Sequence, residues 1–458
     1  MIIQQFFDEF TAQSSYLIGS NSVCAIIDPR RDTEIYINEA EKLQMKITHI
    51  FETHLHADFI SGHMDLASRT DSIICGPQKA GFNFVHSGLK EGDAVSISNL
   101  IIRVIETPGH TPEMINFVIS DSSRNKSDPF AVFTGDTLFV GDTGRPDLFP
   151  GRRDELTEKL YSSLKNKIFK LPDYCEIYPA HGAGSLCGSN IGSKRWSTLR
   201  FERNNNELLK AKKLEDFKKI LFQHELPVPD HFKRCSEINR NGPVLLKNMP
   251  VPVCLNAEDL NKMISQDKKP VVCDIRSYDA FGGQHINGAY NMDFNGIFGN
   301  YCGWLLPYDR EIIIVSENTE EALTAVKVLR RVGIDSKAYY LNKGMDAWAF
   351  NGYETSHIPQ LGPREIESMG KVGDQFTLLD VRNIFEYSQD HIKDAINIPL
   401  HDLRHRFNEV DRQKPVFVYC GSGKRSSLGC SILKMNGITD VFNLAGGFNA
   451  YQRYRGNI

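Results

Sequence analysis

The sequence THLHADF, residues 53–59, follows the apolar run ITHIF and carries two histidines at i and i+2 with an aspartate two positions further on. A loop that leaves a strand is free to curl around an ion, so His54 and His56 can converge on one metal. A single HxH pair is weak support for a metal site, because it also arises by chance. The motifs further along the chain therefore decide the interpretation.

Three further motifs place metal-binding side chains after apolar runs, each beside glycine or proline. They are TPGHT with His110, FTGDT with Asp136 and YPAHG with His181. Strand ends are where α/β proteins place their chemistry. The ordered set HxHxD, GH, GD and AH resembles the metallo-β-lactamase superfamily, which implies an αββα sandwich for this part of an α/β multidomain chain.

The chain departs from the superfamily pattern at one position. The usual motif is HxHxDH, whose last histidine helps to hold a second metal, and Phe59 stands there. A benzyl ring cannot ligate a metal. A two-zinc hydrolase of the glyoxalase II kind would lose a ligand here, whereas a one-metal site loses none, so the sequence favours one metal.

The motifs THLHAD, TPGHTP, FTGDTLFVGDTGRPDLF and YPAH resemble the persulfide dioxygenase branch of that superfamily. The resemblance implies one Fe(II) per metallo-β-lactamase-like domain, with His54, His110 and Asp136 as its ligands. A face of two histidines and one carboxylate leaves positions open for O2 and a substrate sulfur. The spacing of the residues alone does not choose iron over zinc.

The same resemblance places further residues beside the metal. His56, Asp58 and His181 are expected to orient ligands and substrate, with a buried polar residue bonded to backbone as the alternative for each histidine. Arg145, in GRPD, matches an arginine near the thiol-substrate cleft of that branch. It is expected to bind a substrate carboxylate or phosphate through its forked guanidinium, and a surface salt bridge is the alternative.

After YPAH the chain continues GAGSLC, residues 182–187, where relatives that use glutathione commonly carry an acidic-aromatic pair. The carrier thiol is therefore left open among glutathione, coenzyme A, bacillithiol and others. Cys187 is either a second sulfur relay or a packing residue.

Length and composition exclude several classes of protein. The 458 residues exceed a typical domain of about 150, so about two to four domains are expected. With 41 % hydrophobic and 24 % charged residues, the chain is neither disordered nor fibrous. A net charge of -4 gives no electrostatic footprint for nucleic acid.

The sequence predicts neither a signal peptide in its opening residues nor a membrane-spanning segment. No window approaches about 18 consecutive apolar residues, and the opening MIIQQFFDEFTAQSS lacks the basic start and apolar run of a signal peptide. We expect a cytoplasmic protein without membrane contact. The 10 cysteines contain no CxxC pair, so neither a disulfide framework nor a zinc ribbon is indicated.

The rest of the chain contains an internal repeat. VVCDIRSYDAFGGQHINGAYNM from Val271 (the first copy) aligns with TLLDVRNIFEYSQDHIKDAINI from Thr377 (the second copy). Short apolar runs lead into helical segments in both copies. This pattern is typical of a small parallel sheet covered by helices.

In the second copy CGSGKRS, residues 420–426, lies between the strand-like run VFVY and an expected helix. Free backbone N–H groups and the positive end of a helix stabilise a thiolate, and Lys424 and Arg425 add positive charge, so Cys420 is expected to be nucleophilic. The loop is flanked in sequence by DVR (residues 380–382), HI (391–392) and AGG (445–447), and this pattern resembles a rhodanese domain. A cysteine-dependent phosphatase, the main competitor, has five residues between Cys and Arg, whereas four stand here. The substrate-binding residues implied are Gly421, Ser422, Gly423, Lys424, Arg425 and Ser426.

The first copy has lost this loop. Ser316 stands where Cys420 does, and ENTEE, residues 317–321, follows it without a cationic pair or a glycine cradle. Acidic groups oppose a thiolate. We expect a degenerate rhodanese-like unit acting as a structural spacer or an oligomer contact, and hence a homo-oligomer. The predicted domains are 1–240, metallo-β-lactamase-like with a helical extension; 241–357, degenerate rhodanese-like; and 361–458, active rhodanese.

The chain as a whole resembles bacterial fusions of a persulfide dioxygenase and a sulfurtransferase. This implies oxidation of a low-molecular-weight persulfide by O2 to sulfite and thiol, with Cys420 passing a sulfane sulfur to sulfite to give thiosulfate, in sulfide detoxification. Two rivals stay open. One is a zinc-dependent thioester hydrolase fused to a sulfurtransferase, and the other is a sulfide-responsive binding or scaffold protein. Phe59 argues against the first, and the intact ligand set and Cys420 loop argue against the second.

Overall fold

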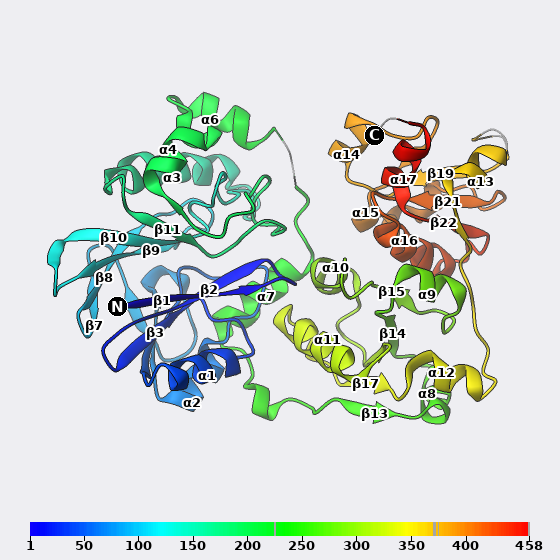
Figure 1. Cartoon of the computed structure of the whole chain (residues 1–458), viewed down its shortest axis with the longest axis horizontal. Helices are drawn as coiled ribbons and strands as arrows, with labels where there is room; N and C mark the ends of the chain where they lie inside the picture. Colours follow the sequence, from blue (N-terminus) through cyan, green and yellow to red (C-terminus); the bar gives the residue numbers. More distant parts are fainter. Residues whose placement is uncertain (224–225, 370–371, 374, 457–458) are drawn as a thin grey trace. The chain divides into compact units, whose positions relative to one another are not determined.

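The computed structural model describes residues 1–223, 226–369, 372–373 and 375–456, and the chain forms two compact units (Figure 1). The first unit comprises Met1–Met249 with Arg330–Gly333, and the second comprises the rest. No helix in the described part of the chain has the length and apolar character needed to cross a membrane. Cytoplasmic location and homo-oligomer formation stay predictions.

The first unit is built on two six-stranded sheets. In spatial order the first contains β1 (Ile2–Asp8), β2 (Gln13–Ser20), β3 (Val23–Ile27), β4 (Lys46–Phe51), β5 (Ile73–Pro77) and β6 (Ser87–Leu89). The second contains β12 (Ser197–Thr198), β11 (Glu176–Pro179), β10 (Asn125–Gly135), β9 (Ile115–Asp121), β8 (Leu100–Glu106) and β7 (Ala94–Ile97).

The two sheets pack face to face over an apolar core. Alternate side chains of the strands point into it, as a two-layer arrangement requires. Phe51 of the first sheet lies edge-on against Phe117 of the second, with ring centroids 5.1 Å apart, and Tyr16 meets Phe133 at 4.9 Å. This core fixes the two sheets against each other and so brings their strand ends to one edge.

Helices cover the outer face of each sheet, which confirms the αββα sandwich (Figure 1). The first sheet carries α1 (Glu34–Lys42) and α2 (His63–Thr70). The second carries α3 (Arg153–Asn166), α4 (Leu199–Asn205), α5 (Glu207–Lys210) and α6 (Leu214–Leu221), and α7 (His231–Asn241) follows. Short 3-10 helices are η1 (Gln78–Ala80), η2 (Ile168–Lys170) and η3 (Leu246–Asn248).

The sequence FERNNNELLKAKKLEDFKKILFQ, residues 201–223, has apolar positions near helical spacing and predicts one helix, and this prediction is wrong. Three short helices stand there instead, because the backbone is extended at Asn206 (ψ 115°) and again at Lys213 (ψ 151°). The Asn206 side chain accepts a hydrogen bond from the N–H of Leu208 and so caps α5, while its amide donates to the carbonyl of Asp142. Asparagine is favoured at such caps and disfavoured in helix interiors. The apolar spacing does not show this break, so it predicted one continuous helix.

The second unit contains two five-stranded parallel sheets. The first is ordered β13 (Val253–Leu255), β17 (Ala338–Leu341), β16 (Ile312–Val315), β14 (Val271–Asp274), β15 (Tyr290–Asn291). The second is ordered β18 (Gln360–Leu361), β22 (Val441–Leu444), β21 (Val416–Tyr419), β19 (Thr377–Asp380), β20 (Ile396–Asn397). Counted within each copy, both orders are the same, so the repeat in the sequence is a repeat in the fold.

The helices of the two copies correspond as well. The first copy has α8 (Ala257–Ile264), α9 (Tyr278–Gly283), α10 (Phe298–Leu305), α11 (Thr319–Arg331) and α12 (Gly344–Phe350). The second has α13 (Pro363–Ser368), α14 (Ile384–Gln389), α15 (Leu400–Arg406), η4 (Phe407–Glu409), α16 (Lys424–Met435) and α17 (Gly447–Tyr454). The predicted limits 1–240, 241–357 and 361–458 stay predictions, and the last of them, Ile458, lies outside the described residues.

Candidate functional site

The three predicted metal ligands meet at one edge of the sandwich. His54 follows β4, His110 follows β8 and Asp136 follows β10, so each comes from the end of a strand. The Oδ2 atom of Asp136 lies 3.3 Å from Nε2 of His110 and 3.8 Å from Nε2 of His54. All three side chains are buried, and their ligand atoms lie within 4.8 Å of one another.

Hydrogen bonds fix which nitrogen of each imidazole faces this point. Nδ1 of His110 lies 2.8 Å from the carbonyl oxygen of Arg145, which can only accept, so Nδ1 carries the proton. The hydroxyl of Thr53 donates to Asp28 at 2.9 Å and accepts from Nδ1 of His54 at 2.9 Å. Both Nε2 lone pairs are therefore free to bind a cation.

The atoms around this point fit a metal ion. Nε2 of His54 and Oδ2 of Asp136 are buried and have no hydrogen-bond partner among the described residues. Unpaired buried polar atoms are costly, and a bound cation would satisfy both. Two histidines and one carboxylate suit Fe(II), and the same donors also bind zinc.

The electrostatics keep these groups ready to ligate. Burial alone would raise the pKa of Asp136, but the neighbouring imidazoles, His181 first, outweigh it and hold that pKa well below its ordinary value. Burial lowers the pKa values of His54 and His110. The site thus holds one carboxylate and two neutral imidazoles at neutral pH.

His181 joins two carboxylates beside the metal point. Its Nδ1 lies 2.7 Å from Oδ1 of Asp136, and its Nε2 lies 2.7 Å from Oδ2 of Asp58. Although burial opposes charge on the ring, these two carboxylates raise the pKa of His181 to about 10. A protonated His181 holds one oxygen of Asp136 and leaves the other facing His54 and His110.

His56 is turned toward a different set of groups. Its Nε2 lies 3.1 Å from Oδ1 of Asp28 and 3.4 Å from Oε2 of Glu52. Although burial alone would lower it, these carboxylates raise the pKa of His56 well above its ordinary value. Asp28 and Glu52 were not identified from the sequence, although each directly follows a strand, β3 and β4, as the other site residues do.

Phe59 fills the position of the histidine that is absent from the motif. It is 1 % exposed, and its ring centroid lies 4.4 Å from that of His56 and 6.3 Å from that of His181. An apolar ring at this place supplies packing and no donor atom. Among the described residues, the group of two histidines and one carboxylate is His54, His110 and Asp136. Two neighbouring groups, Asp58 with His181 and Cys187, and Asp28 with Glu52 and His56, also bring possible ligand atoms together.

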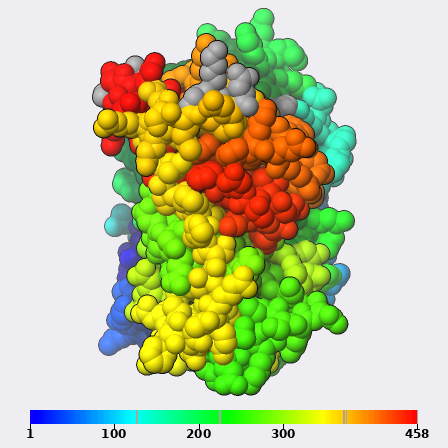
Figure 2. Space-filling view, turned by 90° about the vertical axis from the view of Figure 1, so that its right-hand side faces the viewer, coloured from blue at the N-terminus to red at the C-terminus, as the bar shows by residue number. Residues whose placement is uncertain are grey.

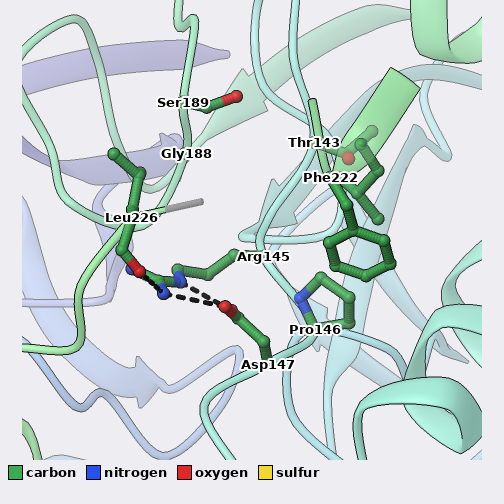
Figure 3. Close-up of a pocket in the computed structure, with 9 residues that line it drawn as sticks. Thr143, Arg145, Pro146, Asp147, Gly188, Ser189, Phe222 and Leu226 are labelled. Carbon is green, nitrogen blue, oxygen red and sulfur yellow. Dashed lines mark hydrogen bonds and ion pairs between the residues drawn. The ribbon is translucent and has the colours of Figure 1, made fainter. Parts of the chain in front are cut away.

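Arg145 is bound by groups of the protein itself (Figure 3). Its guanidinium forms a fork on Asp147, with distances of 2.6 and 2.8 Å, and also donates to the carbonyls of Leu226 and Pro227. It is 6 % exposed and lines a pocket beside Pro146 and Phe222. Its backbone carbonyl fixes the ring of His110, and its role as a substrate contact stays a prediction.

Cys187 lies beside the metal point. Its ligand atom is within 4.8 Å of those of Asp58 and His181. Burial, and then the carboxylates of Asp58 and Asp136, raise the pKa of the thiol well above its ordinary value. The side chain packs with Phe139 in a small apolar cluster, so the structure describes a neutral, packed thiol.

The Cys420 loop forms a cradle at the start of α16. Cys420 follows β21, and its sulfur accepts hydrogen bonds from the N–H of Gly423 at 3.2 Å and from the hydroxyl of Ser426 at 3.4 Å. Gly423 has φ 94°, a left-handed conformation that favours glycine. Gly421 accepts from the N–H of Asn449, which ties the loop to α17.

The side chains of the loop differ in exposure and in partner. Ser422 is exposed, whereas Cys420 is 0 % exposed. Arg425 pairs with Glu386 of α14 through two hydrogen bonds of 2.7 Å. The Nζ atom of Lys424 lies 3.2 Å from Oδ1 of Asp293, a residue of the first copy.

The matching position of the first copy has no thiol. Ser316 follows β16, and its hydroxyl donates to the carbonyl of Asn318 at 2.8 Å. Cys273 and Cys302 are 0 % exposed, and burial raises the pKa of Cys273 well above its ordinary value. The residues described in the first copy thus offer no counterpart of the Cys420 cradle.

Two family models match the chain. The model described as metallo-beta-lactamase superfamily matches residues 8–181. The model described as rhodanese-like domain matches residues 256–351 and 364–454. The matched segments correspond to the αββα sandwich and to the two parallel sheets.

Known proteins resemble different parts of the chain. Persulfide dioxygenase ETHE1, mitochondrial, of Mus musculus is 31 % identical over 221 residues, which cover 46 % of this chain and 80 % of that protein. Hydroxyacylglutathione hydrolase of Dictyostelium discoideum is 28 % identical over 228 residues, covering 49 % and 80 %. A solved metallo-beta-lactamase from Staphylococcus aureus subsp. aureus COL is 33 % identical, covers 74 % of this chain and 99 % of its own, and superposes with a TM-score of 0.67.

Proposed function

Because the chain belongs to the metallo-β-lactamase superfamily and carries two rhodanese-like domains after that fold, we propose that it is a persulfide dioxygenase joined to a sulfurtransferase. The proposed overall reaction of the first unit is RSSH + O2 + H2O giving RSH, sulfite and two protons. The substrate is a low-molecular-weight persulfide, and the proposed pathway clears sulfide.

The observation that carries this proposal is the convergence of the ligand atoms of His54, His110 and Asp136. Phe59, at the position where the superfamily motif has a further histidine, supplies no ligand atom. These three residues would hold one Fe(II). When bound, the iron would supply open coordination positions and redox chemistry that lets the persulfide sulfur give four electrons to O2. The relatives named persulfide dioxygenase support a metal with redox chemistry, which zinc lacks.

The chain's own residues prepare this site in two ways. The carbonyl of Arg145 and the hydroxyl of Thr53 orient the two imidazoles, so that each Nε2 faces the same point. Protonated His181 holds Oδ1 of Asp136 and leaves Oδ2 for the metal. Both devices act before any substrate enters, which is how a binding site is preorganised.

In the second copy we propose that Cys420 carries the sulfur. The Cys420 thiolate attacks the outer sulfur of a persulfide, the S–S bond of the donor breaks, and the electron pair leaves with the donor thiol. Sulfite then attacks the outer sulfur of the cysteine persulfide, which forms the S–S bond of thiosulfate and returns the Cys420 thiolate. The N–H of Gly423 and the hydroxyl of Ser426 stabilise the charge on the sulfur at both stages.

A zinc-dependent thioester hydrolase of the glyoxalase II kind is not favoured. It shares the fold, but Phe59 removes a donor that a second metal needs. The hydroxyacylglutathione hydrolase of Dictyostelium discoideum is 28 % identical, and that of Rhodospirillum rubrum is 34 % identical but is matched over 58 % of its length. The murine persulfide dioxygenase is 31 % identical and is matched over 80 % of its length.

Metal exchange tests the proposal. Removing metal with a chelator is expected to abolish O2 uptake with glutathione persulfide or coenzyme A persulfide. Adding Fe(II) is expected to restore it, and adding zinc is not, because zinc has no redox chemistry. O2 uptake and sulfite are followed together. Thioester hydrolysis by the zinc-loaded protein, with no O2 uptake by the iron-loaded protein, would establish the hydrolase instead.

A further inference from the structure

The first copy reaches into the Cys420 site of the second copy within the second unit. The two copies lie against each other in Figure 2, the first in green to yellow and the second in yellow-orange to red. The side chain of Asn291 accepts from Ser427 of α16 at 2.7 Å, and its backbone N–H donates to Ser431 at 3.1 Å. Two residues further on, Asp293 pairs with Lys424 of the Cys420 loop at 3.2 Å.

The space around this ion pair is closely filled. A Cβ atom on Gly296 would meet Cδ of Lys424 at 2.5 Å, so the lysine side chain lies directly over the backbone of the first copy. The Nζ atom of Lys424 also donates to the carbonyl of Asn295 at 3.5 Å. Tyr278 of the first copy lies over Gly423, with its Cζ atom 3.2 Å from where a Cβ would be. The contacts with Gly296 and Asn295 hold the side chain of Lys424 in one place, and Tyr278 packs on the residue before it.

The pair is shielded from water on one side. The side chain of Asp293 is 8 % exposed and that of Lys424 is 32 % exposed. Charges that are partly buried are screened less by salt than exposed ones. Asp293 therefore offsets the charge of Lys424 more effectively than a surface carboxylate would.

The positive charge of Arg425, the second cation of the loop, is also balanced by a carboxylate. Arg425 forms a two-pronged pair with Glu386, which belongs to the second copy. With Lys424 held by Asp293, each cation of the loop has one carboxylate against it. Binding of an anionic substrate then depends on backbone N–H groups and hydroxyls, such as those of Gly423 and Ser426.

We propose that Asp293 is a positioning residue of the Cys420 site, which holds Lys424 and lowers the affinity of the pocket for multiply charged anions. This rests on the proposed sulfur transfer. Thiosulfate carries two negative charges, whereas a persulfide carries at most one on its sulfur. The site therefore favours the persulfide as sulfur donor and releases thiosulfate as product. The first copy has no thiol of its own at the loop position, but its Asp293 sets the charge of the Cys420 pocket in the second copy.

The test compares two alkylating reagents of the same reactivity class on the full chain. Iodoacetamide is neutral and reports access to the Cys420 sulfur and its nucleophilicity, while iodoacetate adds one negative charge. Modification of Cys420 is followed by peptide mass spectrometry. Changes in access affect both reagents alike, so the ratio of the iodoacetate rate to the iodoacetamide rate isolates the charge of the pocket.

Asp293→Asn is expected to raise this ratio about three- to tenfold at low salt, because it leaves the charge of Lys424 without a partner. Lys424→Met is expected to lower the ratio by a similar factor, because it leaves Asp293 without a partner. The double variant is expected to return close to wild type. The conservative Asp293→Glu keeps the charge and is expected to keep the ratio.

Glu258→Gln is the matched control. Glu258 is a carboxylate of the first copy that pairs with Lys262 on α8 at 2.7 Å, and its side chain is 66 % exposed. Its ratio is expected to equal that of wild type. A ratio within about twofold of wild type in both Asp293→Asn and Lys424→Met, or an equal rise in Glu258→Gln, overturns the proposal.

Sulfur transfer separates this proposal from the function on which it rests. In Asp293→Asn the KM for thiosulfate as donor is expected to fall about three- to tenfold with kcat held, since only binding of the dianion changes. If no variant and no wild-type sample transfers sulfur, the proposed function of Cys420 fails, while the alkylation ratio still decides the role of Asp293. If sulfur transfer is present and the KM for thiosulfate does not fall, the claim about specificity fails.

Discussion

Replacing Asp136 by alanine is expected to lower persulfide-dependent O2 uptake by about a thousandfold or more, and to leave sulfur transfer by Cys420 unchanged. Asp136 is the only carboxylate of the described ligand set, and its Oδ2 faces both His54 and His110. Its loss leaves two neutral imidazoles, which bind a divalent cation poorly. Bound iron, measured on the same sample, should fall together with O2 uptake.

The control for this variant is Asp173→Ala. Asp173 has a side chain that is 60 % exposed and pairs with Arg203, away from the ligand set. The Asp173→Ala protein is expected to keep persulfide-dependent O2 uptake, sulfur transfer and bound iron at wild-type levels. Loss of both activities in a folded Asp136→Ala protein would mean that the two sites are not independent, which contradicts the assignment of one reaction to each.

Replacing Cys420 by serine is expected to have the opposite effect. O2 uptake stays at the wild-type rate and sulfite accumulates, while thiosulfate formation falls to the rate without enzyme, a loss of about a thousandfold. A serine hydroxyl fits the cradle formed by Gly423 and Ser426 but cannot carry a sulfane sulfur. Sulfite and thiosulfate are quantified over time from one persulfide sample.

Cys254→Ser serves as its control, because Cys254 is the exposed cysteine of the first copy and lies on β13, far along the chain from the loop. It is expected to behave as wild type. Thiosulfate formation by Cys420→Ser at the wild-type rate would show that another thiol transfers the sulfur. Cys187, beside the metal point, would be the first to replace in that event.

The ligand set could be predicted from sequence because each member follows a strand. Strands of the two sheets end at one edge of the sandwich, so His54, His110 and Asp136 had to lie near one another once the fold was right. The repeat could be predicted for a similar reason, since aligned apolar runs become aligned strands. In both cases the signal lies within a short stretch of sequence. The fold then only has to bring the ends of the strands together.

The partners of charged side chains could not be predicted in the same way. The pairing of Lys424 with Asp293 joins residues 131 positions apart and depends on how two copies pack. Asp28 and Glu52 beside His56 are common residues after strands, and nothing in their spacing distinguishes them. Asn206 ended a helix that the apolar periodicity alone would have continued.

Titration of metal-free protein with Fe(II) tests the central claim most directly. O2 uptake with a low-molecular-weight persulfide is expected to rise in proportion to bound iron and to level off at one iron per chain, with one sulfite formed for each O2 consumed in Cys420→Ser. This result follows from one ligand set of His54, His110 and Asp136. Absence of O2 uptake at full iron occupancy, or a rise that continues to two metals per chain, would contradict a one-iron persulfide dioxygenase.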